Sequence, residues 1–113
     1  MSTDCIFCKI VAGEIPGDIV YQNEHVTAFR DINPMAPTHV LIIPNEHVES
    51  TETLREPDIA AALMLAPREV AAVEGLGESG YRLISNTGPD GRQEVMHLHI
   101  HLIGGRRMKY PIG

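Results

Sequence analysis

The amino-acid sequence predicts an α+β fold, in which an antiparallel five-stranded sheet has helices packed on one side. Two observations lead to this expectation. Five short segments have the β-branched and aromatic composition of strands, and one longer segment repeats its apolar residues at helical spacing. Because 113 residues suffice for one hydrophobic core of ordinary size, residues 1–113 are expected to form one domain.

The first half of the chain begins with a short capping segment, residues 4–15, and then contains three expected strands: residues 18–21, 25–30 and 39–43. The polar stretch Gln22-Asn23-Glu24 joins the first two strands as in a hairpin. Residues 31–37 include two prolines, each of which restricts its own φ and the residue before it, so a stiff extended loop is expected.

The second half contains the helix and the last two strands. Between residues 58 and 74, apolar residues recur every three or four positions, at Ile59, Leu63, Ala66, Val70 and Val73. Pro57 suits the first turn, whereas Pro67 lies inside the pattern, so the helix is expected to kink or divide there. Residues 81–85 and 96–103 are the remaining strands, joined through the turn-forming residues 86–92.

Composition and charge narrow the possible function classes. The hydrophobic fraction of 43% and the charged fraction of 21% are ordinary for a globular protein, and no apolar stretch is long enough to span a bilayer. The formal net charge of −6 disfavours nucleic acid and anionic membranes as partners. No basic and apolar leader segment precedes Cys5, so the cytoplasm is the expected compartment.

Three histidines alternate with apolar residues in the run His97-Leu98-His99-Ile100-His101. Side chains of a strand alternate between its faces, so these imidazoles are expected on one face, opposite Met96, Leu98, Ile100 and Leu102. Near neutral pH an imidazole can act as a nucleophile, an acid or base, or a metal ligand. A solvated polar face is one alternative, which the strict alternation of three histidines disfavours. A metal site of these histidines alone is another, but ligands two residues apart in an extended strand splay and no nearby carboxylate is obvious, so catalysis is favoured.

This run resembles the signature of the histidine triad (HIT) family. Further segments resemble the nucleotide-binding, HINT-type branch of that family: Cys5-Ile6-Phe7-Cys8-Lys9-Ile10, Gly13-Glu14-Ile15-Pro16, Asp31-Ile32-Asn33-Pro34, Ala36-Pro37-Thr38-His39 and Gly104-Gly105-Arg106. The resemblance covers nearly the whole chain. It implies a hydrolase of purine nucleoside 5′-phosphoramidates or adenylates, that is, of amines linked to AMP, which acts through a covalent nucleotidyl-histidine.

The resemblance also implies roles for individual residues. His99 corresponds to the nucleophile, and His101 and His39 to residues that contact the phosphate and help to move protons. The positions expected around the purine nucleotide are Phe29, Asp31, Ile32, Asn86, Gln93, Glu94 and Val95. For Phe29 an ordinary core position, and for Asn86 an ordinary turn position, remain alternatives.

Two positions depart from the family pattern. Glu94 falls where HINT-type members usually have a serine that can donate to the leaving group, and an ionised carboxylate cannot donate. Its charge is unfavourable near a phosphate unless it turns away, is protonated or meets a cationic leaving group such as a lysyl amine. Tyr110 stands where some relatives have tryptophan in a C-terminal tail that reaches the partner subunit's site.

Cys5 and Cys8 form a C-x-x-C pair, which in a reducing compartment indicates metal binding or redox chemistry. By resemblance to bacterial relatives, Cys5, Cys8, His47 and His97 are expected to hold a structural Zn²⁺. Two thiolates and two imidazoles make a suitable tetrahedral set, which leaves His99 and His101 for chemistry. A reduced pair without metal is the alternative, and no organic cofactor is expected.

Two other functions stay open at this point. The same covalent step would serve cleavage of dinucleoside polyphosphates or nucleotidyl transfer. Glu94 also leaves room for a nucleotide-binding or interaction module with weak catalysis, because a fold alone does not determine function. Relatives commonly form homodimers in which two sheets join, so a homodimer is expected.

Overall fold

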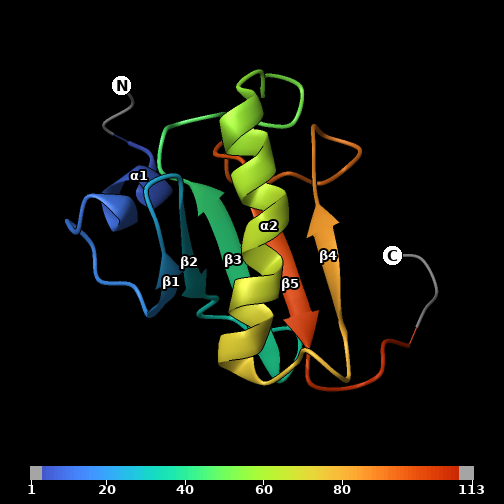
Figure 1. The fold of residues 1–113 in the computed structure, drawn as a ribbon. Coiled ribbons are helices and arrows are strands. Elements are labelled where there is room, and N and C mark those ends of the chain that lie inside the picture. Colours follow the sequence, from blue (N-terminus) through green and yellow to red (C-terminus); the bar gives the residue numbers. More distant parts are fainter. Residues whose placement is uncertain (1–3, 110–113) are drawn as a thin grey trace.

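The computed structural model describes residues 4–109, so the prediction for Tyr110 lies outside it. The described chain forms two helices and five strands (Figure 1). Helix α1 (Ile6–Val11) precedes the strands β1 (Ile19–Gln22), β2 (Val26–Arg30) and β3 (Thr38–Pro44). Helix α2 (Pro57–Glu74) precedes the strands β4 (Tyr81–Ser85) and β5 (Ile100–Gly104).

The strands form a single antiparallel sheet in the order β1-β2-β3-β5-β4, which confirms the predicted five-stranded antiparallel sheet. The last strand of the chain, β5, lies between β3 and β4. His101 on β5 is opposite Leu41 on one side and Ile84 on the other. The histidine run therefore leads into the interior of the sheet, where hydrogen bonds on both sides hold β5 in place.

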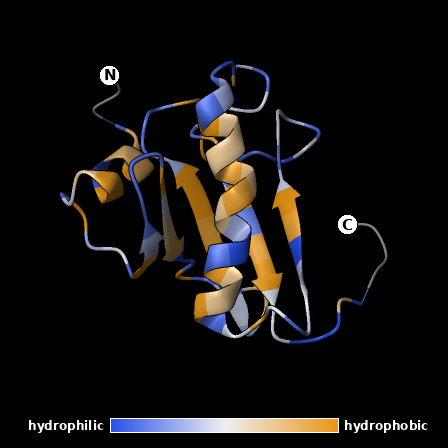
Figure 2. Cartoon of the chain, in the orientation of Figure 1, coloured by the Kyte–Doolittle hydropathy of each residue, from blue (hydrophilic) through white to orange (hydrophobic). Residues whose placement is uncertain are grey.

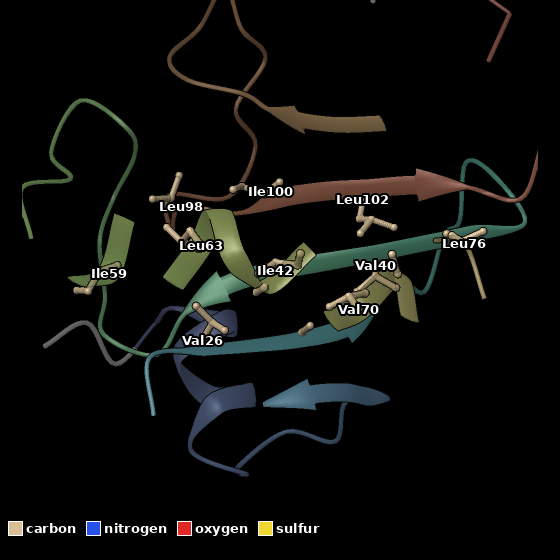
Figure 3. Packing of buried hydrophobic residues seen from close by; sticks show 13 residues of the cluster. Val26, Val40, Ile42, Ile59, Leu63, Val70, Leu76, Leu98, Ile100 and Leu102 are labelled. Atoms are coloured by element: carbon tan, nitrogen blue, oxygen red, sulfur yellow. The ribbon is translucent and has the colours of Figure 1, made fainter. Parts of the chain in front are cut away.

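Helix α2 covers one face of this sheet (Figure 1). Leu63 and Val70 of the helix pack into the same buried cluster as Val40 and Ile42 of β3 (Figure 3). The helix does not divide at Pro67, because α2 runs without interruption from Pro57 to Glu74. A proline removes only one amide donor, and buried side chains on both sides of Pro67 hold the helix against the sheet.

Helix α1 packs on the opposite face of the sheet, so its position differs from the expectation that the helices share one side. Side chains along β3 alternate between the two faces: Val40 and Ile42 point toward α2, whereas Leu41 and Ile43 belong to the cluster beneath α1. The other buried members of that second cluster are Cys5, Phe7, Ile10 and Phe29. Both faces of the central strands are therefore buried.

The last strand begins at Ile100 and not at Met96, which corrects the predicted range of residues 96–103. Residues 95–97 form a bend, and the Leu98 N–H donates to the carbonyl of Val48 in a loop, at 2.6 Å. Met96 is 49% exposed and does not share the buried face of Leu98. The expected alternation therefore holds from His97 onward, although three of the five residues of the run precede the regular strand.

Hydropathy follows this layered arrangement. Hydrophobic residues concentrate along β3 and β5, while many connecting loops are hydrophilic (Figure 2). Neither α1 nor α2, the helices of residues 4–109, combines the length and apolar character needed to span a bilayer.

Candidate functional site

A cavity of about 770 Å³ opens on the α1 face of the sheet. Its walls come from α1, from β2 and the loop after it, from β3, from residues 86–95 and from β5. It is lined by all of the predicted catalytic and substrate-binding residues except Gln93: His39, His99, His101, Phe29, Asp31, Ile32, Asn86, Glu94 and Val95. The structure therefore brings together residues that are up to about seventy positions apart in the sequence.

His99 is buried in the wall of this cavity, with its ring held by the backbone. Its Nδ1 lies 2.8 Å from the carbonyl oxygen of His97. A carbonyl oxygen can only accept, so Nδ1 carries the proton and Nε2 keeps a free lone pair. The edge of the ring contacts Phe7, with centroids 5.3 Å apart. The ring of His99 is therefore oriented by the backbone, and in its neutral form Nε2 is the nitrogen that offers a lone pair.

His39 and His101 form a directed hydrogen-bond chain. The Met35 N–H donates to Nδ1 of His39 at 3.0 Å, and Nε2 of His39 lies 2.9 Å from Nδ1 of His101. Because a backbone N–H can only donate, the proton of neutral His39 is on Nε2, which donates to His101. His101 in turn keeps its proton on Nε2. One backbone amide thus determines the tautomers of both rings.

Burial keeps these two rings uncharged at neutral pH. Desolvation lowers the pKa of His39, opposed by attraction from the Asp31 carboxylate. Desolvation, together with the neighbouring rings of His99 and His39, lowers the pKa of His101 to about 4. Asp31 and Glu94 act on His101 in the opposite direction, but burial outweighs them. His101 is therefore a neutral hydrogen-bond donor.

Asp31 lies beside the histidines in the wall of the cavity. One of its oxygens lies 3.5 Å from Nε2 of His39, and the other accepts the N–H of Asn33 at 2.8 Å. The carboxylate is half-buried, while Ile32 beside it is 92% exposed at the rim. This arrangement leaves a carboxylate edge and an apolar side chain available to a ligand.

Residues 86–95 form a tight loop between β4 and β5. The Asn86 side-chain amide donates to the Gly91 carbonyl at 2.7 Å. The Gln93 amide donates to the carbonyls of Glu49 and Val95 at 2.8 and 3.0 Å, so Gln93 supports the loop and does not line the cavity. A side chain at Gly91 would collide with the backbone of Thr87.

A second cluster lies where the N-terminal segment meets the bend before β5. It consists of the predicted zinc ligands Cys5, Cys8, His47 and His97, whose ligand atoms all lie within 4.8 Å of one another. The Cys5 Sγ is 3.1 Å from Nδ1 of His97, and the Cys8 Sγ is 3.3 Å from Nδ1 of His47. The fold thus assembles this set from three separate segments of the chain.

The chemistry of this donor set fits Zn²⁺. Nε2 of His97 lies 2.9 Å from the Pro44 carbonyl, so Nε2 carries the proton and Nδ1 presents its lone pair to the thiols. Zinc-bound histidines usually donate their second ring nitrogen in this way. Burial and the hydrogen bond to Cys5 raise the pKa of the Cys8 thiol to about 11, and direct metal binding is what deprotonates such a thiol.

Asp31, His39 and His101 also lie close enough together to hold a cation. Their tautomers argue against it. The Met35 N–H occupies Nδ1 of His39, so the nitrogen that faces the group carries a proton and has no lone pair to offer. The availability of a ring-nitrogen lone pair therefore supports a metal at the Cys/His cluster and disfavours one at Asp31, His39 and His101.

Helix α1 joins the cluster to the cavity. Its N-cap residue is Cys5, and its Phe7 ring lies 5.8 Å from the ring of His97 and 5.4 Å from that of Phe29, both edge to face. Phe7 also lines the cavity. Whatever holds Cys5 and Cys8 therefore positions part of the cavity wall.

Comparison with known proteins agrees with this geometry. The HIT domain profile matches residues 12–108. The chain belongs to the HIT family. This HIT protein is 50% identical to the purine nucleoside phosphoramidase of Escherichia coli strain K12, over all of this chain and 93% of the relative. It is 49% identical to a 14 kDa zinc-binding protein of Zea mays, over 96% of this chain and 87% of the relative.

Solved structures of HIT family hydrolases have the same fold as this chain. A HIT family hydrolase from Clostridium thermocellum has a TM-score of 0.94 at 45% identity, with 99% of each chain covered. A HIT family hydrolase from Legionella pneumophila has a TM-score of 0.92 at 45% identity, with 97% of this chain and 100% of that one covered. The predictions that the chain is a HIT protein and that it is a hydrolase are therefore confirmed.

Sequence reasoning missed several groups that shape the site. The Met35 amide and the Pro44 carbonyl are backbone atoms, which a search for reactive side chains does not find. Phe7 could have been found from its place inside the C-x-x-C segment. Arg92 lines the cavity, and its place in an otherwise turn-forming stretch of small residues was the visible signal.

The buried neutral state of His101 predicts how stability depends on pH. The pKa of His101 is about 4 in the folded protein, below the value of about 6.5 in the unfolded chain. Because the unfolded chain then binds the proton more readily, the contribution of neutral His101 to the free energy of unfolding is complete above about pH 6.5 and is lost as the pH falls toward 4. We expect urea unfolding to give a steeper loss of unfolding free energy between about pH 7 and pH 5 for the wild type than for His101→Asn. A matched control, His25→Asn in a surface turn, should keep the wild-type slope; equal slopes for all three proteins would contradict the prediction.

Proposed function

We propose that this HIT hydrolase cleaves purine nucleoside 5′-phosphoramidates and related adenylates, in which an amine is linked to AMP, through a covalent nucleotidyl-histidine on His99. The observation that carries the proposal is the tautomer of His99. Its bond to the His97 carbonyl leaves the Nε2 lone pair at a cavity of about 770 Å³, a size suited to a small ligand. The purine nucleoside phosphoramidase of E. coli, as a relative of 50% identity, supports the substrate class.

In the first step, the Nε2 lone pair of His99 forms a bond to the α-phosphorus. The bond from phosphorus to the amine nitrogen breaks, and the amine leaves with a proton from solvent. Because Nδ1 keeps its proton, the nucleotidyl-imidazole is cationic, and the His97 carbonyl stabilises that charge. In the second step water attacks phosphorus, the electron pair returns to Nε2 and a proton returns to solvent, which completes AMP.

The surrounding residues have supporting roles in this proposal. His101 donates its Nε2–H to a phosphate oxygen, and His39 holds His101 in the tautomer that allows this. Phe29, Ile32 and Val95 form the apolar wall for the base, and the Asp31 carboxylate accepts hydrogen bonds from the ribose hydroxyls. Asn86 and Glu94 lie toward the phosphate, and Gln93 acts indirectly through the loop that carries Glu94 and Val95.

Removing the nucleophile tests the proposal. His99→Ala is expected to lower kcat/KM for adenosine 5′-phosphoramidate by on the order of 10³-fold or more, because the covalent route is lost. Rapid acid quench of the wild type should trap one nucleotidyl group, mapped by mass spectrometry to the peptide that contains His99. His25→Ala should retain full activity.

An unchanged rate in His99→Ala would rule out the covalent route. Nucleotide binding without turnover in the wild type would favour the binding-module alternative. The other alternative, cleavage of dinucleoside polyphosphates, is tested by assaying a diadenosine polyphosphate in parallel. We expect this compound to be the poorer substrate because the Glu94 carboxylate repels an anionic leaving group.

We further propose that Cys5, Cys8, His47 and His97 hold a structural Zn²⁺, which would tie α1 to the bend before β5. The zinc-binding relative in Zea mays supports this assignment. Elemental analysis should find one zinc per chain, and chelation should lower the melting temperature because metal affinity adds to folding stability. The variant Cys8→Ser should lose zinc, whereas the matched variant Ser50→Ala should keep it. Equal zinc content in the wild type and Cys8→Ser would refute the site.

We infer a homodimer in which two β4 strands pair edge to edge. The outer edge of β4 is open in the described chain, and its five-residue register is regular, whereas the opposite edge strand β1 has an irregular register near Ile19. An open regular edge favours pairing. Sedimentation should give twice the 12.4 kDa chain mass, and a single-chain mass at micromolar concentration would overturn the inference.

The free thiols that zinc needs favour the cytoplasm as the compartment.

A further inference from the structure

Three charged side chains, Asp18, Arg30 and Glu74, join the end of β2 to the end of α2. These two elements finish at the same end of the sheet (Figure 1). The Arg30 guanidinium donates from Nη1 to the Asp18 carboxylate at 3.0 Å and from Nη2 to the Glu74 carboxylate at 2.6 Å. The backbone N–H of Arg30 also donates to the Asp18 carbonyl, at 3.0 Å. A planar guanidinium that bonds two separate acceptors has little freedom, so Arg30 is held firmly in place.

Glu74 is an unfavourable place for a carboxylate. Its side chain is only 8% exposed, and it is the last residue of α2, where the helix dipole disfavours negative charge. The last turn of α2, which lies wholly within the described chain, contains no basic residue that would offset this charge. Desolvation of a buried carboxylate cancels much of the attraction in an ion pair. The pair is therefore better explained by the position that it imposes on Arg30 than by stability.

Arg30 directly precedes the segment that organises the pair of His39 and His101. The Asp31 N–H donates to the His39 carbonyl at 2.9 Å, and the Asp31 carboxylate lies 3.5 Å from Nε2 of His39. Four residues later, the Met35 N–H donates to Nδ1 of His39 at 3.0 Å. Successive side chains of a strand alternate between its faces, so the Arg30 guanidinium reaches α2 while the Asp31 carboxylate reaches the histidines. The two faces of the sheet meet at this point of the chain.

Residues 31–37 can transmit the position of Arg30 to the histidine pair. Pro34 and Pro37 restrict their own φ and the residues before them, so this segment is stiff. It connects β2 directly to β3, which begins at Thr38. A stiff segment moves as a unit. A shift at its first residue therefore displaces the Met35 amide, which determines the tautomer of His39.

We propose that Arg30 is a positioning residue, held by Glu74 and acting on the histidine pair through residues 31–37. While Arg30 is held, this segment keeps the proton of His39 on Nε2, from which it donates to His101. When Arg30 is released, His39 also populates the tautomer with its proton on Nδ1, which cannot donate to His101. This inference rests on the proposed phosphoramidate hydrolysis and deepens it, since that reaction requires a fixed donor at His101.

Histidine-selective ¹⁵N NMR tests the proposal without substrate. Protonated and unprotonated ring nitrogens have well-separated ¹⁵N shifts, so the spectrum reports the tautomer of each ring. In the wild type near neutral pH we expect Nδ1 of His39 to be unprotonated, and in Arg30→Met we expect its shift to move toward the protonated value. The loss of a signal in His39→Asn identifies it. Arg30→Lys should give an intermediate shift, because an ammonium lacks the fork that bonds two carboxylates.

The same variants are assayed with adenosine 5′-phosphoramidate. We expect Arg30→Met to lower kcat roughly tenfold, because a mixture of His39 tautomers leaves His101 without a fixed proton to donate. The loss in kcat should follow the size of the ¹⁵N shift across Arg30→Met and Arg30→Lys. A change confined to KM would contradict the proposal.

Further variants separate positioning from stability. Glu74→Gln should shift the His39 signal in the same direction by a smaller amount, since Asp18 still binds Arg30. The double variant Arg30→Met/Glu74→Gln should match Arg30→Met alone, because both changes break one pair. Ile59→Val removes a buried methyl group near the opposite end of α2, so it should lower the melting temperature without changing the shift or kcat. Arg68→Gln, which changes an exposed residue of α2, should change neither.

An unchanged His39 signal in Arg30→Met and Glu74→Gln would overturn the proposal, and so would an equal shift in Ile59→Val. If Arg30→Met does not fold, Glu74→Gln and Arg30→Lys decide the same question. Failure of this proposal is distinct from failure of the proposed function. A shifted His39 signal in a protein without turnover would support the positioning role and refute phosphoramidate hydrolysis. Turnover and a His39 signal that Arg30→Met both leaves unchanged would support hydrolysis and refute the positioning role.

Discussion

Backbone hydrogen bonds to imidazole nitrogens are the constraint on which both sites depend. The Pro44 carbonyl fixes the proton of His97 on Nε2, the His97 carbonyl fixes that of His99 on Nδ1, and the Met35 amide fixes that of His39 on Nε2. A neutral imidazole has one donor and one acceptor, so each of these bonds also determines what the other nitrogen can do. Chemically identical side chains thus become a metal-ligand candidate, a nucleophile candidate and a proton donor to His101.

These bonds also couple the two sites physically. His97 closes the Cys/His cluster, and the carbonyl of the same residue holds the ring of His99 in the cavity. Phe7 contacts both rings from α1, whose N-cap is Cys5. A metal bound at the cluster would therefore order the bend before β5 and the wall of the cavity together. A structural metal would thus act on the cavity through its wall and take no part in the chemistry.

The side chains that line the cavity come both from strands of the sheet and from the loop between β4 and β5. His39 and His101 lie on β3 and β5, inside the sheet, where neighbouring strands pair with them on both sides, and His99 directly precedes β5. Glu94, which departs from the residue expected of the family, lies on the loop between β4 and β5. A loop tolerates substitution because few packed contacts depend on its side chains.

Much of this protein follows from its sequence alone. The apolar spacing of Ile59, Leu63 and Val70 determined α2, and the alternation of His97, His99 and His101 with apolar residues determined which side chains share a face, because both patterns express local backbone geometry. The HIT resemblance brought Cys5, Cys8 and His47 to attention as possible partners of His97. Such features need no knowledge of distant contacts.

Tertiary structure alone decided the rest. Local pattern could not show that the run becomes a strand only at Ile100, since that start depends on Leu98 bonding to Val48. Nor could it show that α1 lies opposite α2, or that Pro67 leaves α2 continuous, because both depend on packing against the sheet. The protonation of each imidazole was the least accessible from sequence. It depends on single backbone atoms of Pro44, His97 and Met35, whose positions exist only once the chain has folded.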